Sequence, residues 1–485
     1  MSAIYRRVIQ PILSEQKSMN NRRFFKRNLF LSSILVGGLG VGPHLHAESL
    51  RATLVDTYQN NPTLLAERSN FRVAAEKLGQ AQGQLLPNAT LTGNTTWQKQ
   101  ETGPLSVNSK PNSVTATVTQ PLFKAAVFWG LGAAYDSIKA ARHRLNLAES
   151  NQLLAAATAY FNLVQDTATL ELQTNNLRVL TAQLDSVQIQ YQIGQLTVTE
   201  VAQAQAAKEN ANAAKLSAEA NLAIDRAVYL QIVGRMPVET GFEDDAIPEK
   251  FLPSSIDAVT EQVTRQNPSV LAAQSDENAA RAGVGVAAGA LLPTVNLVGS
   301  YGIQHQANLA MPGFPTQTTK NMQVMIQMSM PIYDAGLSYT GIRQARQIAN
   351  QQRLLADAAL RAAVQNAMTA YQQLTSSRAQ LVSLEAAIKA NNIALQGTKR
   401  KQELGNMTVL DVLNAEQTLL NSKVQRVQTR RNALVAAYQL MLATGHLYAR
   451  EIELPVEIYD ADYYRDKASW KLFGFGDAVP DATHE

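Results

Sequence analysis

The stretch KQELGNMTVLDVLNAEQTLL, from Lys401 to Leu420, lies between two long segments with helical apolar periodicity and contains their break, at Gly405. A near-copy, YQIGQLTVTEVAQAQAAKE, runs from Tyr191 to Glu209 and places Gly194 at the corresponding position. A glycine between two helical patterns predicts a turn between two helices. Two such turns in one chain predict an internally duplicated architecture.

The repetition extends over nearly the whole chain. Between residues 122 and 236, and again between 332 and 454, the sequence contains no proline. These spans predict two helical hairpins, at 123–233 and 333–450, with arms of about 60 residues, or roughly 90 Å each. Three further marks occur twice in the same order: Asn61-Pro62 and Asn267-Pro268, Leu85-Leu86-Pro87 and Leu291-Leu292-Pro293, and Pro121-Leu122-Phe123 and Pro331-Ile332-Tyr333.

Between these marks the apolar period changes from helical spacing to strict alternation. Two predicted β-hairpins result, at 88–122 and 294–332, with loops over about 103–112 and 306–320. Their strands combine an apolar face with a Thr-, Asn- and Gln-rich face, which is typical of transmembrane barrel strands. Four strands are too few to close a barrel, so several chains contribute to one barrel or the sheet packs as a soluble sandwich. The apolar positions are Ala89, Leu91, Gly93, Trp97, Val114, Ala116, Val118, Leu122, Val295, Leu297, Tyr301, Ile303, Met322, Val324, Ile326, Met328 and Met330.

Residues 1–47 have the pattern of a signal peptide. A charged segment from Met19 to Arg27 precedes an apolar run of about 15 residues, and Ala47 supplies a small residue before cleavage. The run is shorter than the roughly 20 residues of a membrane-spanning helix. The alternative is an uncleaved N-terminal anchor, and translation starts at either Met1 or Met19. An exported chain favours the shared membrane barrel over the soluble sandwich.

Composition excludes several classes of function. Residues 1–47 carry a net charge of +6, whereas the whole chain carries +4. The remaining residues therefore carry −2, a charge that does not indicate nucleic-acid binding. The chain has no cysteine, and its six histidines lack the spacing of a metal site. No nucleophile elbow, phosphate loop or paired-carboxylate motif is present. We therefore expect no catalytic residues, no metal and no cofactor.

The predicted organisation follows these patterns. It comprises a signal peptide (1–47), helical segments (48–87), a first β-hairpin (88–122), a helical hairpin (123–233), an equatorial connector (234–256), helical segments (257–293), a second β-hairpin (294–332), a helical hairpin (333–450) and an equatorial or flexible tail (451–485). The tail, rich in Tyr and Asp, is expected to be partly disordered.

In this order and repetition the marks resemble those of the TolC family of bacterial outer-membrane efflux channels. The resemblance spans about residues 48–455 and rests on the paired motifs and on the Gly turns followed by Thr-Val-x-acid-Val. It implies an α+β membrane protein, a homotrimer whose chains give four strands each to a 12-stranded barrel in outer-membrane lipid. It further implies a helical coiled-coil tunnel in the periplasm, a periplasmic adaptor and an inner-membrane transporter as partners.

The resemblance also places function in the two turns, which in the family close the tunnel entrance and receive the adaptor. An alternative for both acids there is helix capping. The implied constriction residues are Tyr191, Thr199, Glu200, Gln402, Met407, Asp411 and Asn414, and the implied adaptor contacts are Ile193, Gly194, Gln195, Leu404, Gly405 and Asn406. Threefold repetition of Glu200 and Asp411 predicts an electronegative ring that favours cations.

The second turn departs from the family pattern. Gln402 and Met407 stand where an aromatic residue and an arginine are usual, and Asn414 replaces a second acid. The usual charged latch is therefore not expected, and a closed entrance needs other contacts. Two other functions remain: a type I protein-secretion duct of the same architecture, and an exported structural coiled-coil protein, which does not explain the alternating strands.

Overall fold

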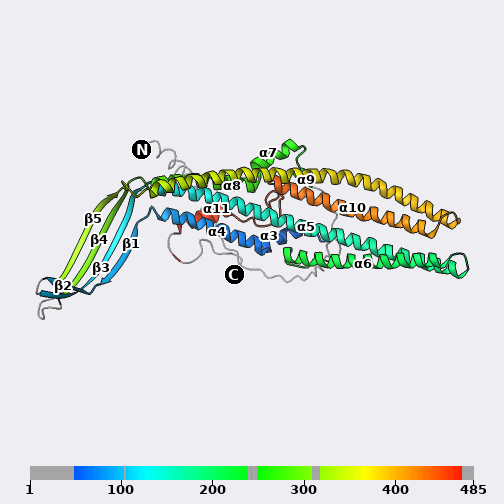
Figure 1. The fold of residues 1–485 in the computed structure, drawn as a ribbon, viewed down its shortest axis with the longest axis horizontal. Coiled ribbons are helices and arrows are strands. Elements are labelled where there is room, and N and C mark those ends of the chain that lie inside the picture. Colours follow the sequence, from blue (N-terminus) through cyan, green and yellow to red (C-terminus); the bar gives the residue numbers. More distant parts are fainter. Residues whose placement is uncertain are drawn as a thin grey trace, which may run out of the picture. The chain divides into compact units, whose positions relative to one another are not determined.

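The computed structural model describes residues 48–102, 105–238, 242, 248–308, 317–471 and 474, so the predicted leader lies outside the described residues. The fold is α+β and dominated by helices (Figure 1). Its helices are α3 (Leu50–Asn60), α4 (Pro62–Gly83), α5 (Ala125–Gln192), α6 (Val198–Val233), a 3₁₀ turn (Glu249–Phe251), α7 (Ile256–Gln266), α8 (Pro268–Gly289), α9 (Leu337–Glu403), α10 (Val409–Thr444) and α11 (Ala461–Trp470). Its strands are β1 (Asn88–Thr95), β2 (Gln98–Thr102), β3 (Leu105–Lys124), β4 (Thr294–Asn308) and β5 (Gln317–Ser329).

Two helical hairpins, α5–α6 and α9–α10, occur where the sequence predicts them. Their arms are unequal, however, because α5 and α9 have 68 and 67 residues, whereas α6 and α10 have 36 each. The prediction of arms of about 60 residues is wrong for the return helices. Each return helix ends at a glycine in the left-handed region, Gly234 (φ +88°) or Gly445 (φ +78°), a conformation that stops a helix at little steric cost.

Two pairs of short helices, α3–α4 and α7–α8, are joined to the ends of the return helices α6 and α10. Asn61 separates α3 from α4, and its Oδ1 accepts hydrogen bonds from the N–H groups of Thr63 and Leu64. Its Nδ2 donates to the carbonyl of Ile232 near the end of α6, at 2.9 Å. One amide therefore caps α4 and joins it to the first hairpin. Between α7 and α8, Asn267 makes the corresponding contacts with Ser269, Val270 and the carbonyl of Ala443.

The strands form one antiparallel sheet in the order β1-β3-β4-β5, and β2 continues the β1 side of β3 (Figure 1). The register aligns the apolar residues in rows: Leu91 is opposite Ala116, Ala116 opposite Tyr301, and Tyr301 opposite Met322. In an antiparallel pair, directly opposite residues project from the same face. The predicted apolar face is therefore confirmed as one continuous surface, and in the single chain it is exposed: Met322, for example, is 80% exposed.

The loops of both β-hairpins are shorter than predicted. Strand β3 begins at Leu105 rather than near residue 113, β4 continues to Asn308 and β5 begins at Gln317. The error at 103–112 comes from reading Pro111 as a loop residue. Pro111 lies within β3, where its carbonyl accepts a hydrogen bond from the N–H of Thr96. A proline keeps its acceptor although it lacks a donor, so it can occupy a strand where only the carbonyl is needed.

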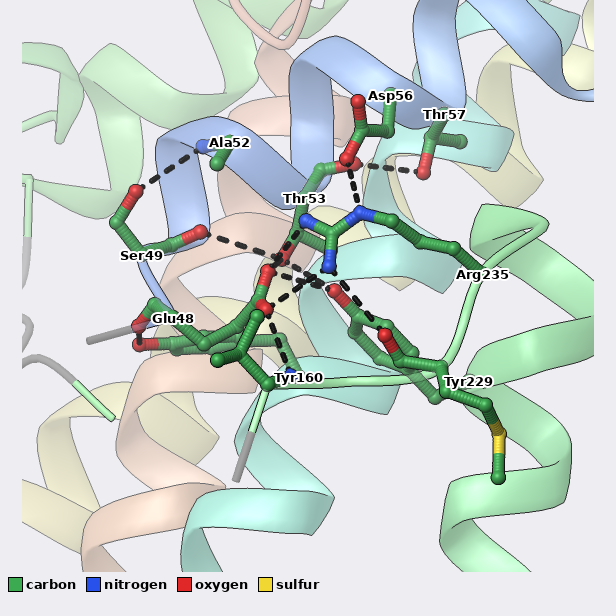
Figure 2. A network of polar contacts seen from close by, with 11 residues as sticks. Glu48, Ser49, Ala52, Thr53, Asp56, Thr57, Tyr160, Tyr229 and Arg235 are labelled. Carbon is green, nitrogen blue, oxygen red and sulfur yellow. Dashed lines mark hydrogen bonds and ion pairs between the residues drawn. The ribbon is translucent and has the colours of Figure 1, made fainter. Parts of the chain in front are cut away.

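A partly buried network of ion pairs and hydrogen bonds joins the start of α3 to the end of α6 (Figure 2). Arg235, two residues after α6, donates from Nη2 and Nη1 to the two carboxylate oxygens of Glu48, at 2.7 and 3.0 Å, and from Nε to Asp56 at 2.6 Å. Glu48 also accepts from the Tyr229 hydroxyl and the Val238 N–H. Burial opposes the ionised form of Glu48, but these donors hold its pKa below the usual value.

The C-terminal tail contains a helix, α11, which was not predicted from the sequence. Asp460 caps α11 by accepting from the N–H groups of Asp462 and Tyr463, and the helix packs on α4. Arg142 of α5 pairs with Asp462 at 2.7 Å. A helix of ten residues has too short a periodic signal to be recognised locally, and its stability depends on these partners.

Candidate functional site

Both turns between long helices have the same backbone geometry. Gly194 and Gly405 adopt φ values of +80° and +76°, and the N–H after each glycine donates to a carbonyl five residues earlier: Gln195 to Gln190, and Asn406 to Lys401, both at 2.9 Å. This is the Schellman arrangement, in which a left-handed residue satisfies the last carbonyls of a helix. The turns predicted at Gly194 and Gly405 are confirmed as reversals with capped helix ends.

A capping acid begins each return helix. The N–H and hydroxyl of Thr408 donate to Asp411 Oδ2 at 2.9 and 2.7 Å, and the Asp411 N–H donates back to Thr408 Oγ1 at 3.2 Å. In the first turn, the N–H of Thr197 donates to Glu200 Oε2 at 2.7 Å. The capping alternative for Glu200 and Asp411 therefore holds in this structure, and it satisfies backbone donors that a helix start leaves unpaired.

The carboxylate of Asp411 remains in contact with solvent. Hydrogen bonds from the hydroxyl and the backbone of Thr408 lower its pKa below the usual aspartate value. Because hydrogen bonds to the charged form stabilise that form, Asp411 stays ionised at neutral pH. An ionised and exposed carboxylate can interact electrostatically with ions in solvent while it keeps its capping hydrogen bonds to Thr408.

The remaining predicted site residues lie on the turns without a common polar network. Among the described residues, no hydrogen bond or ion pair joins one turn to the other, and Glu200 and Asp411 are not brought together. Tyr191, Thr199 and Asn414 are exposed, Gln402 and Met407 are half-buried, and the six residues Ile193, Gly194, Gln195, Leu404, Gly405 and Asn406 are exposed.

The contact that does join the turns is apolar and was missed in the sequence. Val409, the first residue of α10, is 1% exposed and belongs to a cluster with Val187 and Leu184 of α5. Val198 occupies the corresponding place in α6 and is 65% exposed. Because the two valines follow the same Thr and precede the same pattern, no local signal distinguishes them. Only the packing of one hairpin on the other does so.

An ion pair between a buried glutamate and an exposed lysine was also missed. Glu416 of α10 has a side chain 6% exposed, and its Oε1 lies 2.7 Å from Nζ of Lys399 on α9. Glu416 sits five residues beyond Asp411 at a position that the helical periodicity assigns to the apolar face, between Leu413 and Leu420. That exception to the pattern was the available signal.

Within the described ranges, no group of three or more histidine, aspartate or glutamate side chains could hold a metal ion. None of the described helices is both long enough and apolar enough to cross a membrane.

The chain is similar to proteins of known class. A family model described as outer membrane efflux protein matches residues 53–235 and 259–446. Outer membrane efflux protein BepC of Brucella suis is 28% identical over 450 residues, covering 92% of this chain and 96% of BepC. Outer membrane protein TolC of Escherichia coli is 24% identical and covers 84% of each chain. Alkaline protease secretion protein AprF of Pseudomonas aeruginosa is 24% identical over 70% of this chain and 71% of AprF.

Solved structures agree on the fold. The outer-membrane channel OprN has a TM-score of 0.73 with 20% identity, covering 82% of this chain and 89% of that one. At that identity the likeness concerns the fold alone, whereas the family model covers most of this chain. The chain belongs to the outer membrane efflux protein family, and it is an outer-membrane exit duct of an efflux or secretion system.

Proposed function

We propose that three copies of this chain form one passive channel, with a 12-stranded β-barrel in the outer membrane and a helical tunnel in the periplasm. The observation that carries this proposal is the sheet. Its outer strands, β1 and β5, each pair with a neighbour on one side only, and its apolar face is uncovered. Such edges need partners, and such a face needs lipid or protein against it.

The helices support self-association independently. Among the described residues, α6 exposes Val198, Leu216 and Ile224, and α9 exposes Val382 and Ile393, each at least half exposed. Rows of large apolar side chains on long helices are typical of surfaces covered in an assembly. Copies packed side by side would cover them and extend the coiled-coil pattern into a closed tunnel wall.

The chain would use one structural unit twice. The two asparagine caps, the two glycine turns, the two capping acids and the two glycine helix ends support this duplication. In this scheme the predicted organisation stands as proposed, with a leader at 1–47, β-hairpins at 88–122 and 294–332, helical hairpins at 123–233 and 333–450, and a connector at 234–256 with the tail at 451–485 forming an equatorial region.

The turns would bound the periplasmic entrance. Three copies of Glu200 and Asp411, with Thr199 and Asn414 nearby, would give a ring of acids that favours cations over anions. The exposed glycine turns, Ile193–Gln195 and Leu404–Asn406, would receive the periplasmic adaptor, which joins the duct to an inner-membrane transporter. The family consists of channels rather than enzymes, which supports transport without a chemical step.

The trimer and the channel can be tested together. Purified protein should migrate in mild detergent as a species of three chains that dissociates on heating, and it should conduct ions in planar bilayers with a preference for cations. A monomer, or a trimer without conductance, would contradict the proposal.

The adaptor surface needs a separate test. Replacing Gly405 by a bulky residue should block crosslinking to the adaptor while the trimer persists, because no described neighbour lies within 4 Å of an added Cβ and the positive φ of +76° costs only about 1–2 kcal/mol. Retained crosslinking would remove this turn from the adaptor surface.

Efflux and protein secretion remain two uses of the same duct. Similarity to BepC favours efflux, and similarity to AprF favours secretion, the latter over a smaller part of the chain. Deleting the gene should raise sensitivity to toxic small molecules if the duct serves efflux. Loss of an exported protein with unchanged sensitivity would assign it to secretion.

A further inference from the structure

The two β-hairpins of the chain have the same strand register. Asn88 of β1 is opposite Thr119 of β3, and Thr294 of β4 is opposite Ser329 of β5. Thr294 lies 206 positions after Asn88, and Ser329 lies 210 positions after Thr119. The same two offsets relate every other pair of the β1–β3 ladder to a pair of the β4–β5 ladder. They therefore convert a position in one repeat into the equivalent position in the other.

One ladder of the sheet has no equivalent within the chain. Strand β3 of the first repeat pairs with β4 of the second repeat, as far as Lys124 opposite Thr294. The equivalent ladder would join β5 to β1, but these two strands are the opposite edges of the sheet. Four strands are too few for one chain to bring those edges together. A second copy presents the missing edge with the same sequence pattern.

The segment after β5 has the sequence of a strand end that lacks its neighbour. Strand β3 continues to Lys124 because Phe123 pairs with Val295 beyond a β-bulge. The equivalent residue, Tyr333, lies four positions after the end of β5 and pairs with no described strand. Tyr333 is 87% exposed, whereas Phe123 is half-buried. Residues 330–334 would regain the missing pairs against a strand equivalent to β4, which is β1 of a second copy.

The helices next to the sheet show the same contrast. Within one chain, α8 approaches α5 so closely that a Cβ at Gly289 would lie 2.6 Å from the backbone nitrogen of Ala126. Gly83 of α4 is the equivalent of Gly289, and no described atom lies within 4 Å of a Cβ added there. The close approach that glycine permits is thus used in α8 and unused in α4.

Two further small residues are identical in the two helices and differ in exposure. Ala272 and Ser275 of α8 are buried, whereas the equivalent residues of α4, Ala66 and Ser69, are exposed. Small side chains allow the backbones of two helices to approach closely, and an uncovered face that keeps them gains nothing from them in the single chain. The helix equivalent to α5 is α9, so α9 of a second copy fits this face of α4.

We propose that a second copy packs β5 and the start of α9 against β1 and α4 of this chain, in the register that β3 and α5 adopt on β4 and α8. In this register Met330 of one copy lies opposite Leu91 of the other, and Tyr333 lies opposite Ala89. Met330 and Leu91 both belong to the apolar alternation, so the apolar face continues from one copy to the next. A slip of one residue would place apolar residues opposite polar ones.

This inference rests on the proposed function, in which several copies share one barrel. It goes beyond that function because it states which residues of two copies meet. It also states that residues 330–334 become paired strand residues only when a second copy is present.

The register can be tested by disulfide crosslinking, because the chain has no cysteine. Thr92→Cys with Ser329→Cys places thiols directly opposite each other between copies, on the polar face. Thr92→Cys with Met325→Cys moves one thiol four residues along the same face of β5, roughly 13 Å away. Oxidation of the first pair should yield about tenfold more covalent dimer and trimer on denaturing gels, because a disulfide bridges only short Cα separations. Equal yields, or more product from the shifted pair, would overturn the register.

A second crosslink checks that thiols at this type of position can be oxidised. Thr119→Cys with Val298→Cys is the equivalent pair within one chain, since Thr119 is opposite Val298. Its oxidation should leave the number of chains per covalent species at one. If this pair forms its disulfide and the pair between copies does not, the proposed interface is wrong.

The face of α4 is tested by a matched pair of glycines. Gly83→Leu adds a side chain where the single chain leaves open space, so the chain should fold and the yield of heat-dissociable trimer should fall about tenfold from overpacking between copies. Gly132→Leu makes the same change in α5, also with no described atom within 4 Å, on a helix whose neighbours α4 and α8 belong to the same chain. Equal trimer yields of the two variants would overturn the contact of α9 with α4.

The proposed function can fail independently of this inference. If the unchanged protein is not a heat-dissociable trimer, the proposed channel is contradicted. If the trimer forms but the opposed cysteines do not crosslink in preference to the shifted pair, the channel stands and the register is wrong.

Discussion

Asp411 holds the start of α10 and leaves its charge in water. The same carboxylate accepts from Thr408 and stays exposed, so capping and an electrostatic role do not exclude each other. The sequence could predict the capping role because a Thr three residues before an acid is a capping signal, whereas the proposed electrostatic role comes from the family resemblance. It could not predict which turn packs on the other hairpin, because Val409 is buried there while Val198, which follows the same Thr, is exposed.

The two roles of Asp411 can be separated by two substitutions. Asp411→Asn keeps an oxygen that can accept from Thr408 but removes the charge, so cation preference should fall while thermal stability stays close to that of the unchanged protein. Asp411→Ala removes both, and should lower the melting temperature as well. Ion selectivity and thermal unfolding, measured on the same preparations, check this. A selectivity loss confined to Asp411→Ala would mean that capping, and not charge, matters.

The environment of a second acid, Asp225, predicts that the stability of the fold depends on pH. It lines a cavity of about 370 Å³ with Asp166 of α5 and Arg431 of α10, and Arg431 Nε donates to Asn162 at 2.8 Å. Burial, with the charge and hydrogen bonding of Asp166, raises the pKa of Asp225, against the attraction of Arg431. An acid whose pKa is higher when folded than when unfolded stabilises the fold less as pH rises between those two values.

Stability should therefore fall as pH increases from the ordinary aspartate range through the raised pKa of Asp225, and the loss should be complete above it. Asp225→Asn should flatten this part of the profile. Melting temperature measured between pH 4 and 8 for both proteins tests the assignment, with Asp257→Asn on α7 as a control that leaves the slope in place. An unchanged slope in Asp225→Asn would assign the effect to another group.

The ends of the long helices at the turns were predicted correctly from the sequence, whereas the ends of the strands were not. The hairpin turns follow from Gly194 and Gly405, since a left-handed residue can be recognised as a glycine after a helical pattern. The strand ends were misplaced because Pro111 and the polar residues near it suggest a loop, although neighbouring strands continue to pair there. Pairing between distant segments is not visible in local composition.

Gly445 and Gly194 both end a helix but differ in their surroundings, so alanine substitutions at the two positions can be compared. A Cβ at Gly445 would lie 2.5 Å from the carbonyl oxygen of Gln266, whereas a Cβ at Gly194 would meet nothing within 4 Å. Both residues have positive φ, so alanine should cost about 1–2 kcal/mol at either position. Gly445→Ala should lose more than Gly194→Ala in denaturant unfolding, because the junction of α7 and α10 must also move. Equal losses of unfolding free energy would show that the junction of α7 and α10 accommodates the added Cβ without cost.

At the scale of the whole molecule, the sheet is the basis of the proposed assembly of several copies. Its apolar rows were readable from alternation, and four strands were recognised as too few for one chain to close a barrel by itself. The number of copies was not readable, because neither strand alternation nor helix periodicity records the curvature of a closed barrel.

The two faces of the sheet give a prediction for the assembled protein. Leu91→Arg places a charge on the apolar face and should reduce the amount of heat-dissociable trimer in outer-membrane fractions, because arginine facing lipid costs roughly 2–4 kcal/mol near the midplane. Thr90→Arg, one residue away on the polar face, should be tolerated. Equal yields would contradict the assignment of the apolar face to lipid.

The bond between Glu48 and Arg235 joins residues 187 positions apart. A chain emerges from the ribosome N-terminus first, so Glu48 exists long before its guanidinium partner is made. Until then the Thr53 hydroxyl is the one described side-chain donor to its carboxylate that has been made, and α3, at 11 residues, is too short to be stable alone. We therefore expect the N-terminal segment to stay unfolded until the whole first hairpin has been synthesised. An unfolded segment remains competent for export during that period.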